Sequence, residues 1–80
     1  MSRARAVVSV VARALASRPD DVEVTEVERR GQTVVELSMA PGELGRVIGR
    51  QGRTATALRT LAAAAGELDG QRVSVDFVDE

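Results

Sequence analysis

The sequence lacks the two residue types that most often carry catalysis and bind metals in proteins. It contains no cysteine and no histidine. Without cysteine there are no disulfides and no thiolate chemistry, and without either residue the usual zinc ligands and the commonest general base are missing. We therefore expect no enzymatic activity, no metal and no cofactor. The absence of cysteine also fits a reducing compartment, so we expect a cytoplasmic protein.

Aromatic residues and long apolar runs are also scarce. Phe77 is the only aromatic residue, and we expect it in the core, which excludes the base-stacking platforms of RRM and OB folds. No apolar run approaches the roughly 20 residues of a membrane span. Arg13 and Arg18 interrupt the apolar N-terminal stretch, which excludes a signal-peptide core. With 80 residues the chain allows one domain, residues 1–80, in which nearly every apolar side chain is needed for packing.

Lysine is absent, and all 11 basic residues are arginine. This bias indicates either phosphate recognition by planar, multi-donor cations or a GC-rich coding bias. The net charge is only −1, but the charges are unevenly distributed. Residues 1–18 hold four Arg and no acid, and residues 43–59 hold four Arg against Glu43 alone, whereas the remaining segments are acidic. Separate positive and negative faces can attract phosphate locally while the whole chain stays nearly neutral.

The chain begins with a predicted amphipathic helix. Ser2 can cap a helix over residues 3–17, in which apolar side chains recur every three or four residues. The expected apolar stripe consists of Val7, Val10, Val11, Ala14 and Leu15. Pro19 forbids further helix and begins a turn.

A β-hairpin is predicted next. Alternating side chains indicate strands over 22–27 and 33–39, joined by a turn at 28–32. Val27 falls out of phase, which indicates either a bulge or an early end of the first strand. The inward side chains of the second strand are expected to be Val35, Leu37 and Met39.

Two helices and a last strand complete the predicted fold. A short helix over 42–48 is followed by the loop 49–52, a longer helix over 53–65 ended by Gly66, and a strand over 72–78. Their expected buried side chains are Leu44, Val47, Ile48, Ala57, Leu58, Leu61, Ala65, Val73, Val75 and Phe77. The order α-β-β-α-α-β predicts an α+β two-layer sandwich, with a three-stranded sheet covered by helices on one face.

The loop 49–52 has the pattern Gly-x-x-Gly, and its context is specific. The run Val-Ile-Gly-Arg-Gln-Gly-Arg-Thr at 47–54 joins two helices after a hairpin, and it resembles the signature of KH domains of the prokaryotic, type II arrangement. With the Pro-Asp-Asp-Val run at 19–22, the whole chain resembles the KhpA family of small bacterial RNA-binding proteins.

This resemblance implies a function and partners. It implies binding of single-stranded RNA through the GXXG loop and a role as an RNA chaperone or post-transcriptional regulator. It also implies a homodimer, or a complex with a second KH-containing protein of the KhpB (Jag) type, and a link to cell-wall biogenesis and cell shape. No membrane and no small-molecule substrate are implied.

The expected RNA-binding residues surround this loop. The glycines allow a sharp bend and close approach of a phosphate, and the unpaired N–H groups of the next helix favour an anion. The expected set is Arg46, Val47, Ile48, Gly49, Arg50, Gln51, Gly52, Arg53 and Thr54. Thr54 is equally well explained as a helix N-terminal residue, and Arg59 as a solvated surface residue. Many KH domains have isoleucine where this chain has Ala55, which predicts weaker discrimination between bases.

Two other functions remain open at this stage. The domain could serve chiefly as a protein-interaction (dimerisation) module, through the GXXG surface or the Val-rich first helix. It could also be a ribosome-associated KH protein with little affinity for free RNA. Salt dependence separates RNA binding from apolar association, because only the former releases counterions from phosphate.

Overall fold

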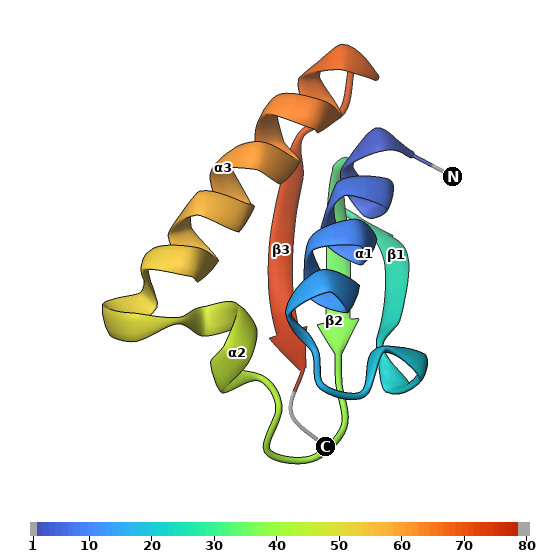
Figure 1. Ribbon diagram of the computed structural model, residues 1–80. Helices are drawn as coiled ribbons and strands as arrows, with labels where there is room; N and C mark the ends of the chain where they lie inside the picture. The colour runs from blue at the N-terminus through green and yellow to red at the C-terminus, as the bar shows by residue number, and fades with distance from the viewer. Residues whose placement is uncertain (1, 79–80) are drawn as a thin grey trace.

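The computed structural model describes residues 2–78 and has the predicted order of helices and strands (Figure 1). Two short 3₁₀ turns, η1 and η2, lie between them. The elements are α1 (Arg3–Leu15), η1 (Pro19–Asp21), β1 (Glu23–Arg29), β2 (Gln32–Ser38), α2 (Gly45–Ile48), η2 (Arg50–Gly52), α3 (Arg53–Leu68) and β3 (Val73–Val78). No helix among the described residues is long and apolar enough to cross a membrane.

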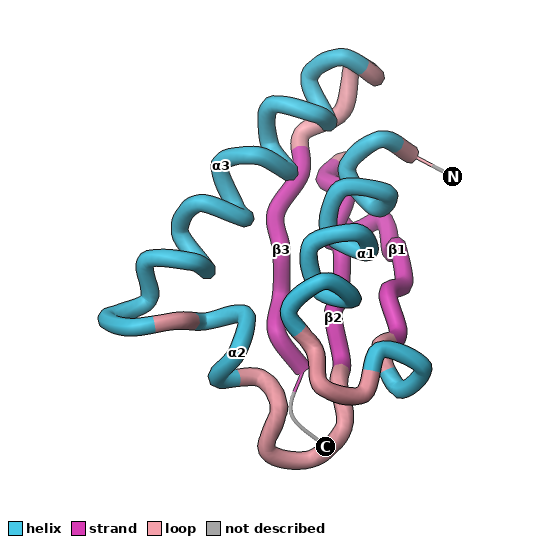
Figure 2. The backbone as a smooth tube through the Cα atoms, in the orientation of Figure 1, coloured by secondary structure: helices cyan, strands magenta, loops and turns pink. Residues whose placement is uncertain are grey.

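The three strands form one mixed sheet in the order β1-β2-β3. β1 and β2 pair antiparallel as a hairpin, and β2 and β3 pair parallel. Parallel neighbours require a crossover connection, which α2, η2 and α3 supply. α1 and α3 both lie on one face of the sheet (Figure 2). The fold is therefore the predicted two-layer α+β sandwich.

The core lies between the helices and the sheet. Val35 and Leu37 of β2 are completely buried, and Met39 beyond them is nearly so, as their alternation predicts. On β3, Val75 is buried, while Val73 and Phe77 are half-buried and pack against the same cluster. The cluster of buried side chains consists of Ala4, Val8, Ala12, Val22, Val24, Val35, Leu37, Met39, Val47, Leu58, Ala62 and Val75.

The hairpin is longer and its turn tighter than predicted. β1 pairs with β2 without a bulge as far as Arg29, so the expected break at Val27 is wrong. Val27 is paired with Val34 on the open face of the sheet, where the two side chains lie opposite each other and are half-buried. Arg30 and Gly31 both have positive φ (53° and 76°), as in the type I′ turns whose twist suits two-residue hairpins.

The first helix begins as predicted but buries a different face. The Ser2 hydroxyl accepts a hydrogen bond from the Arg5 backbone N–H (3.1 Å), which confirms the cap. The helix ends at Leu15, where that side chain is 38% exposed, and Val10 is 69% exposed. The predicted stripe is therefore wrong. The buried residues of α1 are Ala4, Val8, Ser9 and Ala12, a set of mostly small side chains that lets α1 pack closely on the sheet and α3.

The long helix α3 is also rotated relative to the prediction. Leu58 is buried as expected, but Leu61 is 53% exposed and Ala57 is exposed. The buried positions are Ala55, Leu58, Ala62 and Gly66. Gly66 lies inside the helix instead of ending it, because a Cβ there would collide with the side chain of Val73 at the start of β3. The helix continues to Leu68.

The short helix α2 begins three residues later than predicted. Pro41 and Gly42 form a turn, with Gly42 at φ +82°, and regular helix begins only at Gly45. Val47 is fully buried and Leu44 is half-buried, but Ile48 is 37% exposed. Only part of the predicted apolar side of this helix therefore reaches the core.

Candidate nucleic-acid interface

The loop between α2 and α3 reverses the chain through three consecutive unusual conformations. Gly49 leaves α2 at φ 74° and ψ 176°, a region that only glycine adopts readily. Gln51 (φ 57°) and Gly52 (φ 72°) are both left-handed, and α3 begins directly afterwards at Arg53. In Figure 1 this segment forms the tip of the molecule furthest from α1. The sequence Gly-Arg-Gln-Gly thus supplies a protruding loop followed immediately by a helix start.

The two glycines have different surroundings. A Cβ at Gly49 would collide with the side chain of Thr54. A Cβ at Gly52 would have no heavy atom within 4 Å, so the space beside Gly52 is open. Thr54 therefore packs against Gly49 and is half-buried, whereas the backbone at Gly52 can be approached from solvent.

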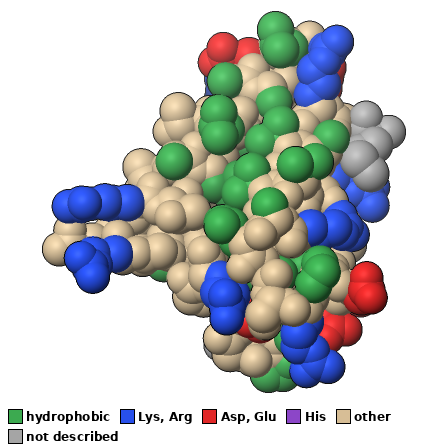
Figure 3. Space-filling model, in the orientation of Figure 1, with side chains coloured by type: hydrophobic (Ala, Val, Ile, Leu, Met, Phe, Trp, Pro, Cys, Tyr) green, Lys and Arg blue, Asp and Glu red, His purple; other side chains and the backbone are tan. Residues whose placement is uncertain are grey.

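The loop side chains are exposed donors. Arg50, Gln51 and Arg53 are all exposed, and the Arg53 guanidinium donates to the Gln51 side-chain oxygen (3.0 Å). Among the described residues neither arginine forms an ion pair with a carboxylate. In Figure 3 basic side chains project from this tip with no acidic side chain beside them in that view. Both positive charges are thus available to an anion.

The start of α3 adds an electrostatic contribution from the backbone. No side chain caps this helix, and its first turn contains no acidic residue. The first N–H groups of a helix have no partner within the helix, and the helix dipole places partial positive charge there. In this position they face the same open space as Gly52, which is a geometry suited to phosphate.

Three of the expected site residues lie elsewhere or are already engaged. Val47 is fully buried and belongs to the core, whereas Ile48 reaches the surface. Arg46 is half-exposed but donates through Nε to Oε2 of Glu43 (2.8 Å), so its charge is partly matched. The structure thus gathers Arg50, Gln51 and Arg53 at the tip and places the other members behind or beneath it.

Glu43 is an important residue near the site that the sequence analysis did not single out. It is only 8% exposed, and its carboxylate accepts hydrogen bonds from Ser17 N–H (2.9 Å), Ser17 Oγ (2.9 Å) and Arg18 N–H (3.1 Å), besides the one from Arg46. The Ser17 hydroxyl first, and then the other donors, hold the pKa of Glu43 below its usual value against the opposing effect of burial. The carboxylate joins the end of α1 to the segment that carries α2 and the loop. The only signal in the sequence was a lone acid in a basic segment.

Arg59 and Phe77 form a second contact that the sequence did not predict. The guanidinium carbon of Arg59 lies 4.8 Å from the centroid of the Phe77 ring, within the range of a cation–π contact. Phe77 packs against the core, as expected, but it is only half-buried. Arg59 is therefore held on the ring and is more than a solvated surface residue.

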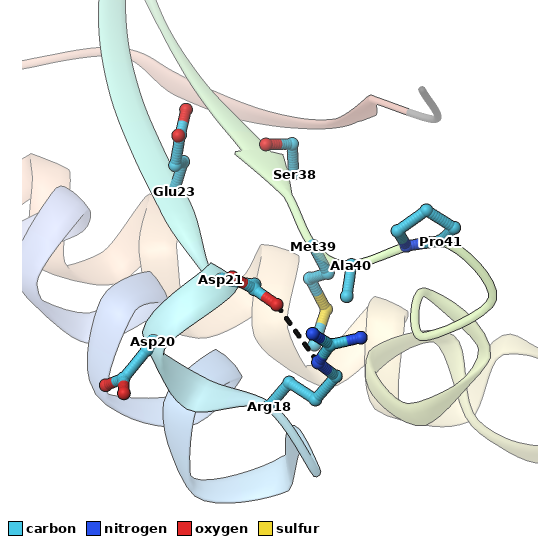
Figure 4. Close-up of a pocket in the computed structure, with 8 residues that line it drawn as sticks. All are labelled: Arg18, Asp20, Asp21, Glu23, Ser38, Met39, Ala40 and Pro41. Atoms are coloured by element: carbon cyan, nitrogen blue, oxygen red, sulfur yellow. Dashed lines mark ion pairs between the residues drawn. The ribbon is translucent and has the colours of Figure 1, made fainter.

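A separate cavity of about 340 Å³ lies between η1 and the end of β2 (Figure 4). Arg18 forms an ion pair with Asp21 across it (3.1 Å), which the dashed line marks. Asp20 and Glu23 add further negative charge to its lining. An excess of carboxylates repels phosphate, so this cavity does not extend the loop site.

The architecture and the loop together define a type II KH domain. An N-terminal helix, a hairpin, two helices joined by GXXG and a parallel third strand are all present in the order of that class. A comparison with protein families agrees, because the family described as "KhpA/KhpB, KH domain" matches residues 5–77.

Individual relatives extend this result over nearly the whole chain. The RNA-binding protein KhpA of Aquifex aeolicus is 43% identical over 79 residues, which cover 99% of this chain and 100% of the relative. Proteins of the same name in Leifsonia xyli (49% over 70 residues, 88% of this chain and 90% of the relative) and Mycobacterium tuberculosis (53% over 68 residues, 84% and 80%) are also similar. No solved structure gives a significant match. The chain belongs to the KhpA/KhpB family of KH domains, which are not enzymes.

Proposed function

We propose that this protein binds single-stranded RNA, with a phosphate held between the Gly49–Gly52 loop and the start of α3. The observation that carries the proposal is the open, left-handed backbone at Gly52, directly before an uncapped helix with no acid in its first turn. Arg50 and Arg53, which no described carboxylate neutralises, add two cations beside it. The name of the relatives, RNA-binding protein KhpA, supports the same ligand.

The experiment that tests this function uses the loop tip. Arg50→Asp/Gln51→Asp should leave the fold intact, because both side chains are exposed and Asp tolerates the left-handed conformation of Gln51. It should abolish binding of a fluorescently labelled single-stranded RNA pool in anisotropy titrations, since two carboxylates then face the phosphate path.

A matched control exists at the other end of the sheet. Arg30 is exposed and left-handed at the hairpin turn, so Arg30→Asp makes the same charge change as Arg50→Asp far from the loop. It should reduce RNA affinity much less than Arg50→Asp alone. Equal losses would show that binding depends on overall charge, and an unchanged double variant would remove the loop from the site.

Self-association is a second candidate function, and a specific surface favours it. Apolar side chains gather over α1 and α3 in Figure 3. Val10 of α1 is 69% exposed, and Leu61 and Leu68 of α3 are 53% and 72% exposed. Exposed apolar patches of this kind commonly mark interaction surfaces. The structure therefore favours the helical face over the GXXG loop as the interface.

We propose a second copy of this chain as the occupant of that face. The exposed stripe of α3 is nearly symmetrical about Leu61, with alanine on each side at 57 and 64. A two-fold axis through Leu61 would pack two α3 helices antiparallel, as a self-complementary interface requires. It would also bring Arg53 of each copy towards Glu67 of the other, so the charges at the ends of the stripe are complementary. The dimer would present two loops and gain effective concentration on one RNA.

Leu61→Glu tests the dimer against Thr60→Glu, which places the same charge one residue away, off the apolar stripe. Sedimentation equilibrium should show a dimer for the parent and for Thr60→Glu, and a monomer for Leu61→Glu. A parent that is monomeric at all concentrations would contradict this proposal without affecting RNA binding by the loop. A dimer that persists in Leu61→Glu would place the interface elsewhere.

With two loops per dimer, the protein would act on cellular RNA as a chaperone or post-transcriptional regulator. A second, larger KH-containing protein of the KhpB type could take the place of one copy. Mixing the protein with such a partner and measuring whether the heterodimer forms at the expense of the homodimer would distinguish the two assemblies.

A further inference from the structure

We infer that Arg59 and Phe77 form a stacking site for a nucleobase, next to the loop that holds phosphate. The inference rests on the proposed RNA binding and adds a contact to a base. KH loops of this kind grip the backbone, and nothing in the loop itself offers a flat surface to a base. The structure supplies that surface one and a half turns further along α3.

The first observation is the geometry of the pair. Phe77 is fixed from below, because it packs against the hydrophobic core while one part of the ring stays exposed. The Arg59 guanidinium lies over this ring at 4.8 Å from the centroid. Among the described residues no carboxylate forms an ion pair with Arg59. A planar cation therefore rests on an aromatic ring, and its outward side is exposed.

The second observation is a cavity at the same place. Arg59 is one of six residues that line a hollow of about 360 Å³ between α3 and the edge strand β3. The others are Thr60, Ala63, Val73, Ser74 and Val75. The lining contains one cation and no carboxylate, whereas the cavities beside η1 and on the open face of the sheet both contain glutamate. Of these three cavities, this one suits a nucleic-acid base best.

The third observation is continuity with the loop. Arg53 begins α3 at the loop, and Arg59 lies six residues later, which is about 9 Å along a helix. A strand whose phosphate is held at Gly52 can therefore continue along the side of α3 and place its next bases beside Arg59. Bases of single-stranded RNA commonly stack on arginine planes as well as on aromatic rings.

These observations explain how a chain with one aromatic residue can stack a base. The Phe77 ring orients the guanidinium, and the guanidinium presents its other side to the base. Stacking depends on the plane of the guanidinium, so a lysine at 59 would keep the charge but lose the contact. A purine should gain more than a pyrimidine, because its stacking surface is larger.

The test uses labelled RNA octanucleotides of one sequence, with an abasic site placed at each position in turn. For the parent, one abasic position outside the central four nucleotides should lower affinity about tenfold, the lower part of the range for one stacked base. Arg59→Lys should lose the same factor on the intact RNA and nothing further on that abasic RNA. Arg30→Lys, a matched change at the hairpin turn, should behave as the parent.

A second variant addresses the ring. Phe77→Leu keeps an apolar side chain at a half-buried position, so thermal melting can establish that it folds. It should lose the base-dependent part of binding and retain the loop-dependent part. Equal loss by Arg59→Lys on intact and abasic RNA would assign Arg59 to phosphate or to folding, and would overturn the stacking site.

The outcomes for the two proposals are separable. If the parent binds RNA, depends on Arg50 and Gln51, and is indifferent to every flanking abasic site, then only the stacking site is overturned. If the parent binds no RNA at all, the proposed function fails and the stacking site fails with it. A change in dimerisation by Arg59→Lys, without a change in RNA affinity, would assign the cavity to a protein contact and also overturn the inference.

Discussion

Gly49 and Gly52 bracket the same loop, but each is glycine for a different physical reason. Gly49 combines a backbone conformation that other residues avoid with a direct contact to the Thr54 side chain. Gly52 has only the left-handed conformation, and its Cβ position opens to solvent. The first glycine therefore maintains the loop, and the second keeps the path of the phosphate clear.

Alanine substitutions should separate these two roles. Gly49→Ala should lower the free energy of unfolding by about 3 kcal/mol, because it adds a steric collision to a strained backbone. Gly52→Ala should cost about 1 kcal/mol, the cost of a left-handed alanine, but should weaken RNA binding disproportionately. Urea denaturation and anisotropy titration of both variants check this expectation. A Gly52→Ala protein with parental RNA affinity would contradict the phosphate path.

At the same scale, the sequence predicted residues whose role is local and missed those whose partners are distant. The Ser2 cap and the GXXG glycines depend on neighbours within a few positions, so the sequence alone identifies them. Glu43 was missed because its donors lie 25 and 26 residues earlier in the chain. The Arg59–Phe77 contact was missed because nothing in a sequence shows which surface arginine lies over which ring.

At the scale of the elements, the helical faces were the hardest part to predict. In α1 and α3 alanine, valine and leucine occur on several sides, so two apolar stripes about one residue apart fit the sequence equally well. The structure buries the stripe with the smaller side chains, such as Ala4, Ala12 and Ala62, because close helix packing needs them. Val10 and Leu61 were expected inside and lie outside, where they form the proposed dimer surface. The strands were predicted better, since alternation leaves only one choice of inward face.

The join between α1 and α2 should depend on pH through Glu43. Its pKa is lowered from an ordinary value of 4.5 in the folded protein, so the charged carboxylate stabilises the fold above that value. The stabilisation should disappear as the pH falls through the lowered pKa. Glu43→Gln should therefore melt at a lower temperature than the parent near neutral pH, because the amide nitrogen would face hydrogen-bond donors. This difference should shrink in acid.

Thermal melting followed by circular dichroism at neutral and acidic pH measures this effect. Glu28→Gln, on the exposed surface of β1, is the control for a general loss of negative charge. If the melting temperatures of Glu43→Gln and the parent differed equally at both values of pH, the ionised carboxylate would not be the stabilising species. A fall in RNA affinity of Glu43→Gln near neutral pH would show in addition that the join positions the loop.

At the scale of the whole molecule, the near-zero net charge conceals a polar distribution. The basic tip carries Arg50 and Arg53, whereas Glu23 and Glu36 face solvent on the opposite, open side of the sheet. Arg29 pairs with Glu36 there, which reduces but does not reverse the negative charge. The sequence already indicated separate basic and acidic segments, and the fold places them on different sides.

This distribution predicts a modest dependence of RNA binding on salt. Between two and four arginines can reach phosphate, so the logarithm of affinity should fall with that of salt with a slope of roughly −1.4 to −2.8 per domain. Titration of a short single-stranded RNA at several salt concentrations gives this slope directly. Arg53→Gln should reduce its magnitude by about 0.7. A slope near zero would indicate that apolar contacts dominate, and would favour the protein-interaction role.

The parallel pairing of β3 has a consequence for how the protein is made. The hairpin of β1 and β2 closes over two residues, whereas β3 must return to β2 across the whole crossover. Contacts between distant segments form slowly, because a long loop must close before they contribute. The GXXG loop lies inside that crossover and is held at both ends only when β3 has docked. During synthesis and refolding, the ability to grip RNA should therefore be acquired in the last step, together with the final strand.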